Sequence, residues 1–338
     1  MYRRPAALTR ALRPVLRSVP LATLAALSAG AATATPPARG PAAVPTAQTA
    51  PAAPAAVSLD AERARIDEWR AQRAASLTGD NGWLTLAGLF WLEEGTNTFG
   101  RSPASALRLD NPSLAAESGY FLLREHKVRF IARPGSGVMH AGQPVTELDL
   151  RSDAEAEPTV LESGSLRFYI IERAGNLGVR VRDLNNPRRA SFRGFDYFPV
   201  STDWVLEARY EPYEPARHLH IINILGMEED TVSPGAVVFT KDGHEWRLDT
   251  VLEQPGDSEL FIMFADTTSG HETYGAGRFL YIPLPSGGHA RLDFNEAYNP
   301  PCALNDFATC PLPPRQNRLR LRVDAGEKSY ADGPAHKS

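Results

Sequence analysis

Residues 278–294 read RFLYIPLPSGGHARLDF, and this stretch indicates the fold class of the chain. Apolar residues alternate with others on both sides of a Pro-Ser-Gly-Gly turn, which is typical of two half-buried strands. We expect a hairpin in which Phe279 faces Phe294 on an apolar side. This register would place Arg278 and Asp293 together on the opposite side.

The same pattern of short apolar or alternating runs continues from residue 83 to residue 323, with turn dipeptides such as Asp242-Gly243 between the runs. Many short strands at this spacing favour sandwiches or barrels. The predicted fold is therefore mostly β, with antiparallel sandwich-like or barrel-like sheets and one N-terminal helix. Alternation also predicts a strand at residues 319–323.

One convincing helix is expected at residues 59–77, immediately before this β pattern. Ile66, Trp69 and Leu77 fall near one face of it. Ser58 is positioned to cap the first turn, since a serine oxygen can accept a hydrogen bond from a free backbone amide there.

Residues 1–34 have the pattern of a secretory signal peptide. Five arginines precede an apolar run at 19–32, which ends in Ala-Thr-Ala at 32–34. The run is shorter than the roughly 20 residues of a permanent transmembrane helix. An Arg-rich extension without a targeting role is the alternative. Residues 35–57 are an Ala/Pro-rich linker that lacks the apolar content to order itself. We expect a periplasmic or secreted protein with no stable membrane anchor after cleavage.

The charge of the mature chain argues against polyanionic partners. The whole chain has a formal net charge of −4, and loss of the five leader arginines without any acid makes it −9. Nucleic acid and anionic membranes favour Lys/Arg patches, so we expect no nucleic-acid partner. A small-molecule ligand is the partner that this composition permits.

Two soft boundaries interrupt the β pattern, an acidic stretch at 152–158 and a Glu- and Pro-containing stretch at 211–215. The first predicts a helix and a β-sandwich at 58–152, followed by a C-terminal β domain at 159–330. A single composite unit is the alternative.

The chain has two cysteines, Cys302 and Cys310. In an oxidising compartment such a pair predicts a disulfide, worth about 2–3 kcal/mol for a short loop. A metal is less favoured, because two thiolates are half of a tetrahedral site and no nearby His completes it.

Two segments resemble a prokaryotic family catalogued as a domain of unknown function. They are GDNGWLTLAGLFWL at 79–92, and LDFNEAYNPPC at 292–302 with ATCPLPPRQNRL at 308–319. The likeness extends over nearly all of residues 60–330. It implies a β-rich fold and supplies no activity.

The first half also resembles the layout of forkhead-associated phosphopeptide-binding domains. Arg101 follows a Gly, as does the arginine that helps those domains to hold phosphate. No Ser-x-x-His follows Ser113, and Ala141 stands where an Asn is expected. The resemblance therefore implies a sandwich and does not carry phosphothreonine binding.

The densest polar group surrounds the expected hairpin and the Pro-rich loop, residues 300–314. An Arg–carboxylate pair beside Tyr, His and amide groups suits a small anionic or sugar-like ligand. The predicted ligand-binding residues are His271, Glu272, Tyr274, Arg278, Asp293, Asn295, Tyr298 and Asn299. The alternative is a buried ion-pair network that fixes the loop without binding anything.

Other chemistry has weaker signals, and no catalytic residue is assigned. His271-Glu272 lacks the second His of a metalloprotease motif, and His218 with His220 offers only two ligands, so no metal is predicted. No nucleophile elbow, Walker A loop or dinucleotide fingerprint is present, so no cofactor is expected. A ligand-binding protein leads. The rivals are a hydrolase that uses Asp293 or Glu272 as acid/base, and a structural envelope protein.

Overall fold

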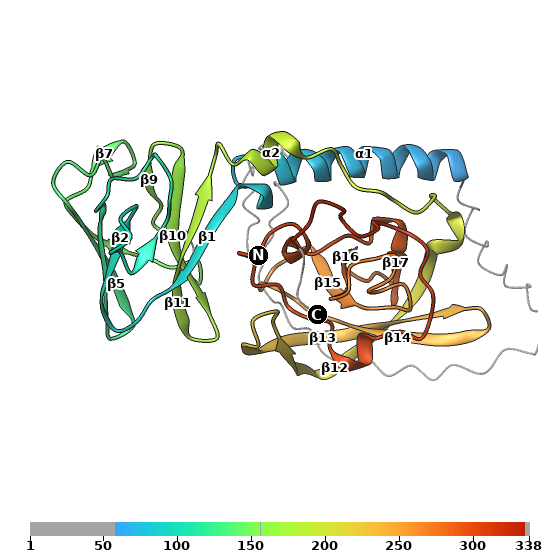
Figure 1. Ribbon diagram of the computed structural model, residues 1–338. Helices are drawn as coiled ribbons and strands as arrows, with labels where there is room; N and C mark the ends of the chain where they lie inside the picture. The colour runs from blue at the N-terminus through green and yellow to red at the C-terminus, as the bar shows by residue number, and fades with distance from the viewer. Residues whose placement is uncertain (1–57, 156, 335–338) are drawn as a thin grey trace, which may run out of the picture. The chain divides into compact units, whose positions relative to one another are not determined.

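The computed structural model describes residues 58–155 and 157–334 (Figure 1). The predicted signal peptide and linker lie outside these residues. Strands account for 44% of the structure and helices for 14%, so the predicted mostly-β class is confirmed. No helix in the described part of the chain is both long and apolar enough to span a membrane.

Helix α1 (Leu59–Thr78) is the predicted N-terminal helix. Ile66 and Leu77 are fully buried and Trp69 is nearly so, which confirms the predicted face. The predicted Ser58 cap is wrong: its side chain makes no capping bond, and the first turn closes through the backbone bond from the Glu62 amide to the Ser58 carbonyl.

The first β region consists of two sheets. One sheet has the order β1 (Leu86–Trp91), β11 (Asn176–Asp183), β10 (Leu166–Arg173), β9 (Leu161–Ser163), β6 (Met139–His140), β7 (Gln143–Pro144). The other has the order β3 (Leu107–Arg108), β2 (Gly95–Gly100), β4 (Gly119–Arg124), β5 (Lys127–Ala132), β8 (Glu147–Leu150). All pairings are antiparallel except that of β2 with β3.

Aromatic side chains from both sheets meet in one core. Phe99 of β2 lies 5.1 Å from Phe168 of β10, measured between ring centroids, and Phe121 of β4 lies 6.3 Å from the same ring. This sandwich core extends to Val181. The expected boundary at 152–158 therefore falls within the chain segment that builds the first sandwich, because β9, β10 and β11 follow it in sequence and belong to that sandwich and not to the C-terminal region.

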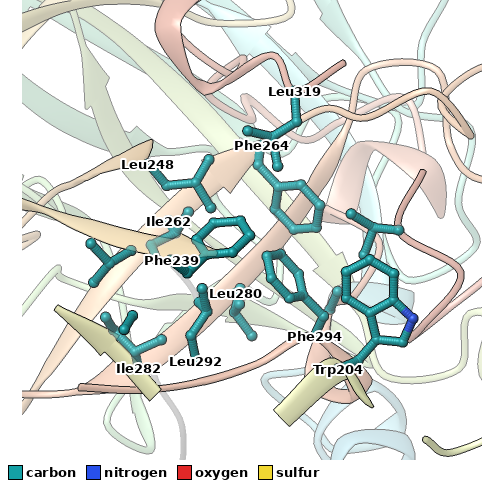
Figure 2. Packing of buried hydrophobic residues seen from close by; sticks show 14 of the residues in the cluster. Trp204, Phe239, Leu248, Ile262, Phe264, Leu280, Ile282, Leu292, Phe294 and Leu319 are labelled. Carbon is teal, nitrogen blue, oxygen red and sulfur yellow. The ribbon is translucent and has the colours of Figure 1, made fainter. Parts of the chain in front are cut away.

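The second β region has a four-stranded sheet and a two-stranded sheet. The first has the order β14 (His244–Thr250), β13 (Glu228–Lys241), β12 (Val205–Ile222), β17 (His289–Asp293), and the second pairs β15 (Glu259–Phe264) with β16 (Arg278–Pro283). Figure 2 shows their shared core, in which Phe294 contacts Trp204, Phe239 and Phe264. The described residues nevertheless form one compact unit.

Short helical segments join these parts. They are α2 (Pro187–Ser191) and the 3-10 turns η1 (Trp83–Thr85), η2 (Thr202–Trp204), η3 (Phe294–Glu296), η4 (Pro301–Ala303) and η5 (Arg315–Asn317).

The expected hairpin at 278–294 does not form. β16 pairs with β15, and β17 pairs with β12. Local alternation identified both strands correctly, but each strand pairs with a strand that lies farther away in the sequence. The prediction that Phe279 faces Phe294 is therefore wrong.

Two further expectations fail in the second region. β12 runs through the expected boundary at 211–215 as one strand, with a register shift between Pro212 and Arg217. Residues 319–323 form no strand, although Leu319, Leu321 and Val323 are buried. The segment makes two backbone hydrogen bonds with residues 265–267, from the Leu319 amide to the Ala265 carbonyl and from the Thr267 amide to the Leu321 carbonyl, so its buried alternation comes with only a brief pairing that does not extend into a strand.

Candidate functional site

Arg278 is fully buried and serves the architecture of the second core. Its guanidinium donates to the Val323 carbonyl at 2.9 Å, to the Asp266 carboxylate at 3.3 Å and to the Ala325 carbonyl. Burial lowers its pKa, and Asp266 opposes that change. Arg278 makes no pair with Asp293, so the expected ligand-binding pair is not formed.

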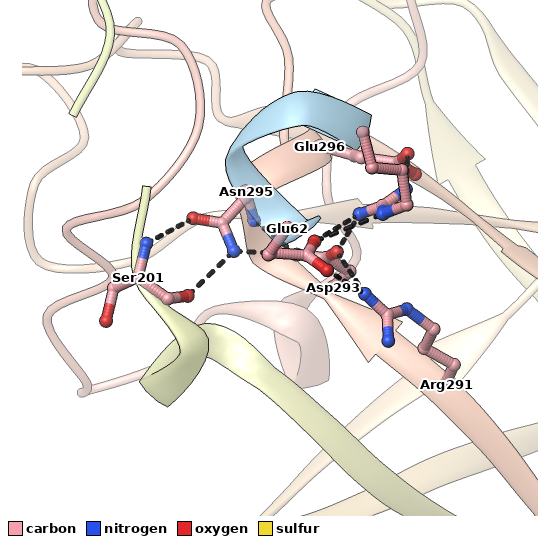
Figure 3. A network of polar contacts seen from close by, with 7 residues as sticks. Glu62, Ser201, Arg291, Asp293, Asn295 and Glu296 are labelled. Carbon is pink, nitrogen blue, oxygen red and sulfur yellow. Dashed lines mark hydrogen bonds and ion pairs between the residues drawn. The ribbon is translucent and has the colours of Figure 1, made fainter. Parts of the chain in front are cut away.

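Asp293 lies in a different network, which joins α1 to β17 (Figure 3). One carboxylate oxygen accepts from the Asn295 amide at 3.0 Å and from its side chain at 2.9 Å. The other accepts from Arg291 at 3.0 Å and from Arg65. Asn295 also bonds to both backbone groups of Ser201, so the hydrogen-bonding groups of these residues are occupied by protein partners.

Glu62 and Asp293 form a carboxyl pair within this network. Burial and the hydrogen bond to Glu62 raise the pKa of Asp293 to about 7. Burial would raise the pKa of Glu62, but hydrogen bonds with Arg65, Asp293 and Arg291 lower it to about 2. Two carboxyls this close share one proton near neutral pH.

Tyr298 and Asn299 belong to a third group, which binds α1 to the end of the chain. The Asn299 amide donates to Glu327 at 2.7 Å. Arg73 of α1 pairs with Glu327 in turn, donates to the Asn299 carbonyl at 2.9 Å, and stacks 4.3 Å from the Tyr298 ring centroid.

His271 and Glu272 lie at the surface, away from these networks. Glu272 forms an ion pair with Arg322, whose hydrogen bond lowers the carboxyl pKa. His220 bonds to two acids on the exposed side of β12, Glu228 and Asp230. Within residues 58–334, masked position aside, no group of three or more His, Cys, Asp or Glu side chains could hold a metal ion.

Both cysteines are buried free thiols, so the predicted disulfide is not formed in this structure. The Cys302 amide donates to the Cys310 sulfur at 3.1 Å. Hydrogen bonding with Cys310 lowers the pKa of the Cys302 thiol, against burial, and Tyr274 contributes a further hydrogen bond. The two buried thiols are thus hydrogen-bonded neighbours beside Tyr274.

A hollow of about 650 Å³ lies at the register shift of β12, lined by residues 212–217. None of the predicted ligand-binding residues lines it. The structure therefore distributes those residues over separate networks instead of gathering them around one cavity.

Two buried arginines, missed in the sequence, form a different candidate site. Arg180 and Arg182 lie on the same side of β11, opposite the sandwich core that contains Val179 and Val181. Arg180 is 2% exposed and Arg182 is 9% exposed. The strand places two positive charges side by side because alternate residues point to the same face.

The partners of these arginines are neutral. Arg180 donates to the Thr309 hydroxyl of the Pro-rich loop at 3.3 Å, and its Nε has no partner. Arg182 donates to the Gly82 carbonyl at 2.8 Å and the Thr85 hydroxyl at 2.9 Å. Burial lowers the pKa of Arg180. Among the residues that the structure describes, no carboxylate forms an ion pair with either guanidinium.

An aromatic ring and an acid that pairs with another arginine lie near Arg180 and Arg182. The Trp83 ring centroid lies 5.6 Å from the Arg180 guanidinium and 5.7 Å from that of Arg182. Asp153 is near enough to favour the charge of Arg180, but it forms a 2.8 Å ion pair with Arg173. We call Arg180, Arg182, Trp83 and Thr309 the arginine site. The arginine site contains two buried positive charges without a paired carboxylate among the described residues.

A sequence signal for this site exists in the run GVRVRD at residues 178–183. Arginines that alternate with valines put charge on one face of a strand whose other face is apolar. Such a face is usually solvated, and only the contacts with Trp83 and Thr309 show that it is buried.

The fold and this site together define a mostly β protein with two cores and a buried cationic surface beside the Pro-rich loop. Residues 190–328 match the family described as "Protein of unknown function (DUF1684)", so the chain contains a DUF1684 domain. This confirms, for those residues, the expected domain of unknown function. The likeness of residues 79–92, outside the matched range, stays a prediction.

A solution NMR structure of an uncharacterized protein from Haloarcula marismortui also matches. It is 30% identical, and the alignment covers 43% of this chain and 82% of that one, with a TM-score of 0.37. No curated protein matches this chain.

Proposed function

We propose that this protein binds a small anionic ligand at the arginine site, with Arg180 as the anchor. The observation that carries the proposal is a guanidinium that is 2% exposed and whose hydrogen-bond partner is a neutral hydroxyl. A buried charge is stable only when it is paired and hydrogen-bonded. An anion would supply the missing charge.

The chemistry of the site favours a carboxylate or an oxyanion of the phosphate type. Guanidinium groups bind these planar or tetrahedral oxygens through two parallel hydrogen bonds. The free Nε of Arg180 and its neighbouring nitrogens provide such a fork, and the Thr309 hydroxyl can add a further bond. Trp83 keeps water from one side of the site.

The rival functions have less support. Asp293 has the raised pKa of a general acid, but both of its oxygens are occupied by Asn295 and by arginines. Glu272 is committed to Arg322. The networks of Arg278 and Asn299 fit structural roles, because their polar groups bond to other parts of the protein.

Thermal unfolding tests the proposal with paired variants. In buffer without multivalent anions, Arg180→Met should be as stable as the native protein or more stable, because it removes an uncompensated buried charge. Phosphate or citrate should raise the melting temperature of the native protein and leave that of Arg180→Met unchanged. Arg101→Met, at an exposed position, is the matched control and should respond as the native protein does. Equal responses of all three proteins would contradict the proposal.

We also propose that the chain is exported, as its N-terminal pattern predicts. Intact mass measured on protein from the periplasm should correspond to a chain that begins after Ala34. Failure to alkylate the denatured protein would reveal a Cys302–Cys310 disulfide formed in that compartment. A full-length mass with two alkylated thiols would contradict both expectations.

A further inference from the structure

The segment from residue 315 to residue 323 lies on the second core with one buried side and one exposed side. Leu319 and Leu321 belong to that core (Figure 2). The side chains that alternate with them point away from it into solvent. Four exposed arginines gather in this segment, Arg315, Arg318, Arg320 and Arg322. We call them the arginine row.

Backbone hydrogen bonds hold the row on the core. The Leu319 amide donates to the Ala265 carbonyl at 2.8 Å, and the Thr267 amide donates to the Leu321 carbonyl at 3.0 Å. The positive groups therefore project from a stretch of backbone that is already ordered. A partner that binds them does not have to order that backbone, which reduces the entropic cost of binding.

One arginine of the row already binds a carboxylate. Arg322 donates two hydrogen bonds to Glu272, one to each carboxylate oxygen. This is the fork geometry that a guanidinium forms with a planar carboxylate. The pair lies in solvent, with 53% of the Arg322 side chain exposed, so the row can hold a carboxylate at the surface.

The other arginines of the row have no such partner. Among residues 58–155 and 157–334, no carboxylate lies within ion-pair distance of Arg315, Arg318 or Arg320. The next acid along the chain, Asp324, accepts a hydrogen bond from the Trp204 indole at 2.8 Å. Like charges so close in sequence repel one another, and carboxylates from a partner would relieve that repulsion.

The charge of the whole chain restricts the kind of partner. The protein has a formal net charge of −4, so this basic segment belongs to an acidic molecule. A long polyanion such as nucleic acid would extend beyond the row and be repelled by the acidic remainder. A short acidic peptide segment would contact the row alone, and it would bring the carboxylate group that Arg322 already binds.

We propose that the arginine row docks a short acidic segment of a partner protein, whose Asp or Glu carboxylates pair with Arg315, Arg318 and Arg320. Glu272 competes with that segment for Arg322. The proposal does not depend on the arginine site, whose guanidinium groups are buried.

Fluorescence anisotropy with full-length protein at low ionic strength tests the proposal. The probe is a labelled peptide in which Glu and Ser alternate, and its control has Gln in place of every Glu. A single-stranded oligothymidylate with the same number of charges is the polyanion control. The Glu peptide should bind most tightly. No binding of the Glu peptide, or equal binding of the Gln peptide, would overturn the proposal, and tighter binding of the oligonucleotide would overturn the assignment to a peptide.

A pair of double variants locates the binding. Arg318→Gln combined with Arg320→Gln should weaken binding of the Glu peptide at least about fivefold. Arg101→Gln combined with Arg124→Gln removes the same charge from exposed positions in the first sandwich, and should bind as the native protein does. Equal weakening in both double variants would reveal a general effect of net charge and would overturn the row as the docking surface.

A substitution of Glu272 should have the opposite effect. Glu272→Gln frees Arg322 for the peptide, so the Glu peptide should bind about two- to fivefold more tightly. Glu94→Gln removes an exposed carboxylate from the first sandwich and should leave the affinity unchanged. Equal affinities of the two variants would overturn the competition between Glu272 and the partner.

Discussion

Arginines of this chain occupy three different settings, and the setting decides what each one does. Arg278 is buried beside Asp266 and donates to two backbone carbonyls, so its charge is compensated. Arg322 pairs with Glu272 in solvent. Arg180 is buried with a neutral partner. Only the last setting leaves a buried charge for a ligand to neutralise.

Truncation of Arg278 and truncation of Arg322 should lower the free energy of unfolding by very different amounts. Arg278→Ala removes the cationic partner of the buried Asp266 carboxylate and leaves two buried carbonyls without their donor, and should reduce the free energy of unfolding by about 3–5 kcal/mol. Arg322→Ala breaks an exposed pair that water and salt screen, so it should change the free energy of unfolding far less. Urea denaturation of both variants measures the difference. Similar small losses would show that Arg278 does not stabilise the second core.

At the scale of elements, α1 is held by charged contacts as well as by its apolar face. Glu62, Arg65 and Arg73 connect it to β17 and to the end of the chain. The helix could be predicted from Ile66, Trp69 and Leu77, because helical periodicity is a local property. Its polar partners lie more than 200 residues away, and no local pattern identifies them.

The carboxyl pair of α1 and β17 should make stability depend on pH. The unfolded chain titrates Asp near 3.8 and Glu near 4.5, whereas the folded pair titrates near 2 and 7. Between about pH 4.5 and 7 the folded state holds one proton that the unfolded state has released, so the contribution of the pair falls as the pH rises. Below pH 3.8 the unfolded chain holds the extra proton, and the contribution falls as the pH drops.

Substitution of one member of the pair tests this sign. Asp293→Asn cannot titrate, so its unfolding free energy should lose the decline between pH 4.5 and 7. Asp149→Asn, at an exposed position in the first sandwich, should keep that decline. Denaturation midpoints measured at several pH values across this range check the result, and identical profiles for Asp293→Asn and the native protein would contradict the shared proton.

For residues 278–294 the sequence predicted the strands but not their partners. Alternation correctly identified β16 and β17 as strands, since side-chain periodicity is local. Partner choice depends on which apolar faces meet in the assembled core, and β15 and β12 provided better ones. The expected site around Arg278 and Asp293 rested on that register and failed with it.

At the scale of the whole molecule, the second core depends on a helix that precedes the first. The DUF1684 match begins at residue 190, so it does not include α1. Two residues within the match, Asp293 and Glu327, nevertheless form ion pairs with arginines of α1. The two cores are therefore parts of one compact unit. Composition and strand spacing predicted a β-rich chain, while the arginine site required knowledge of which faces are buried.

A fragment of residues 190–334 should accordingly be less stable than a chain that starts at Ser58. It would expose the α1 contact surface and leave the carboxylate of Glu327 buried without Arg73. Urea unfolding followed by tryptophan fluorescence should show a lower midpoint for the fragment. Equal midpoints would show that the second core is independent of α1.

Calorimetric titration of the protein with phosphate and with citrate at low ionic strength measures anion binding at the arginine site. We expect one anion bound per chain, and loss of that binding in Arg180→Met with Arg101→Met unaffected. Heat of binding that persists unchanged in Arg180→Met would contradict the assignment of the arginine site.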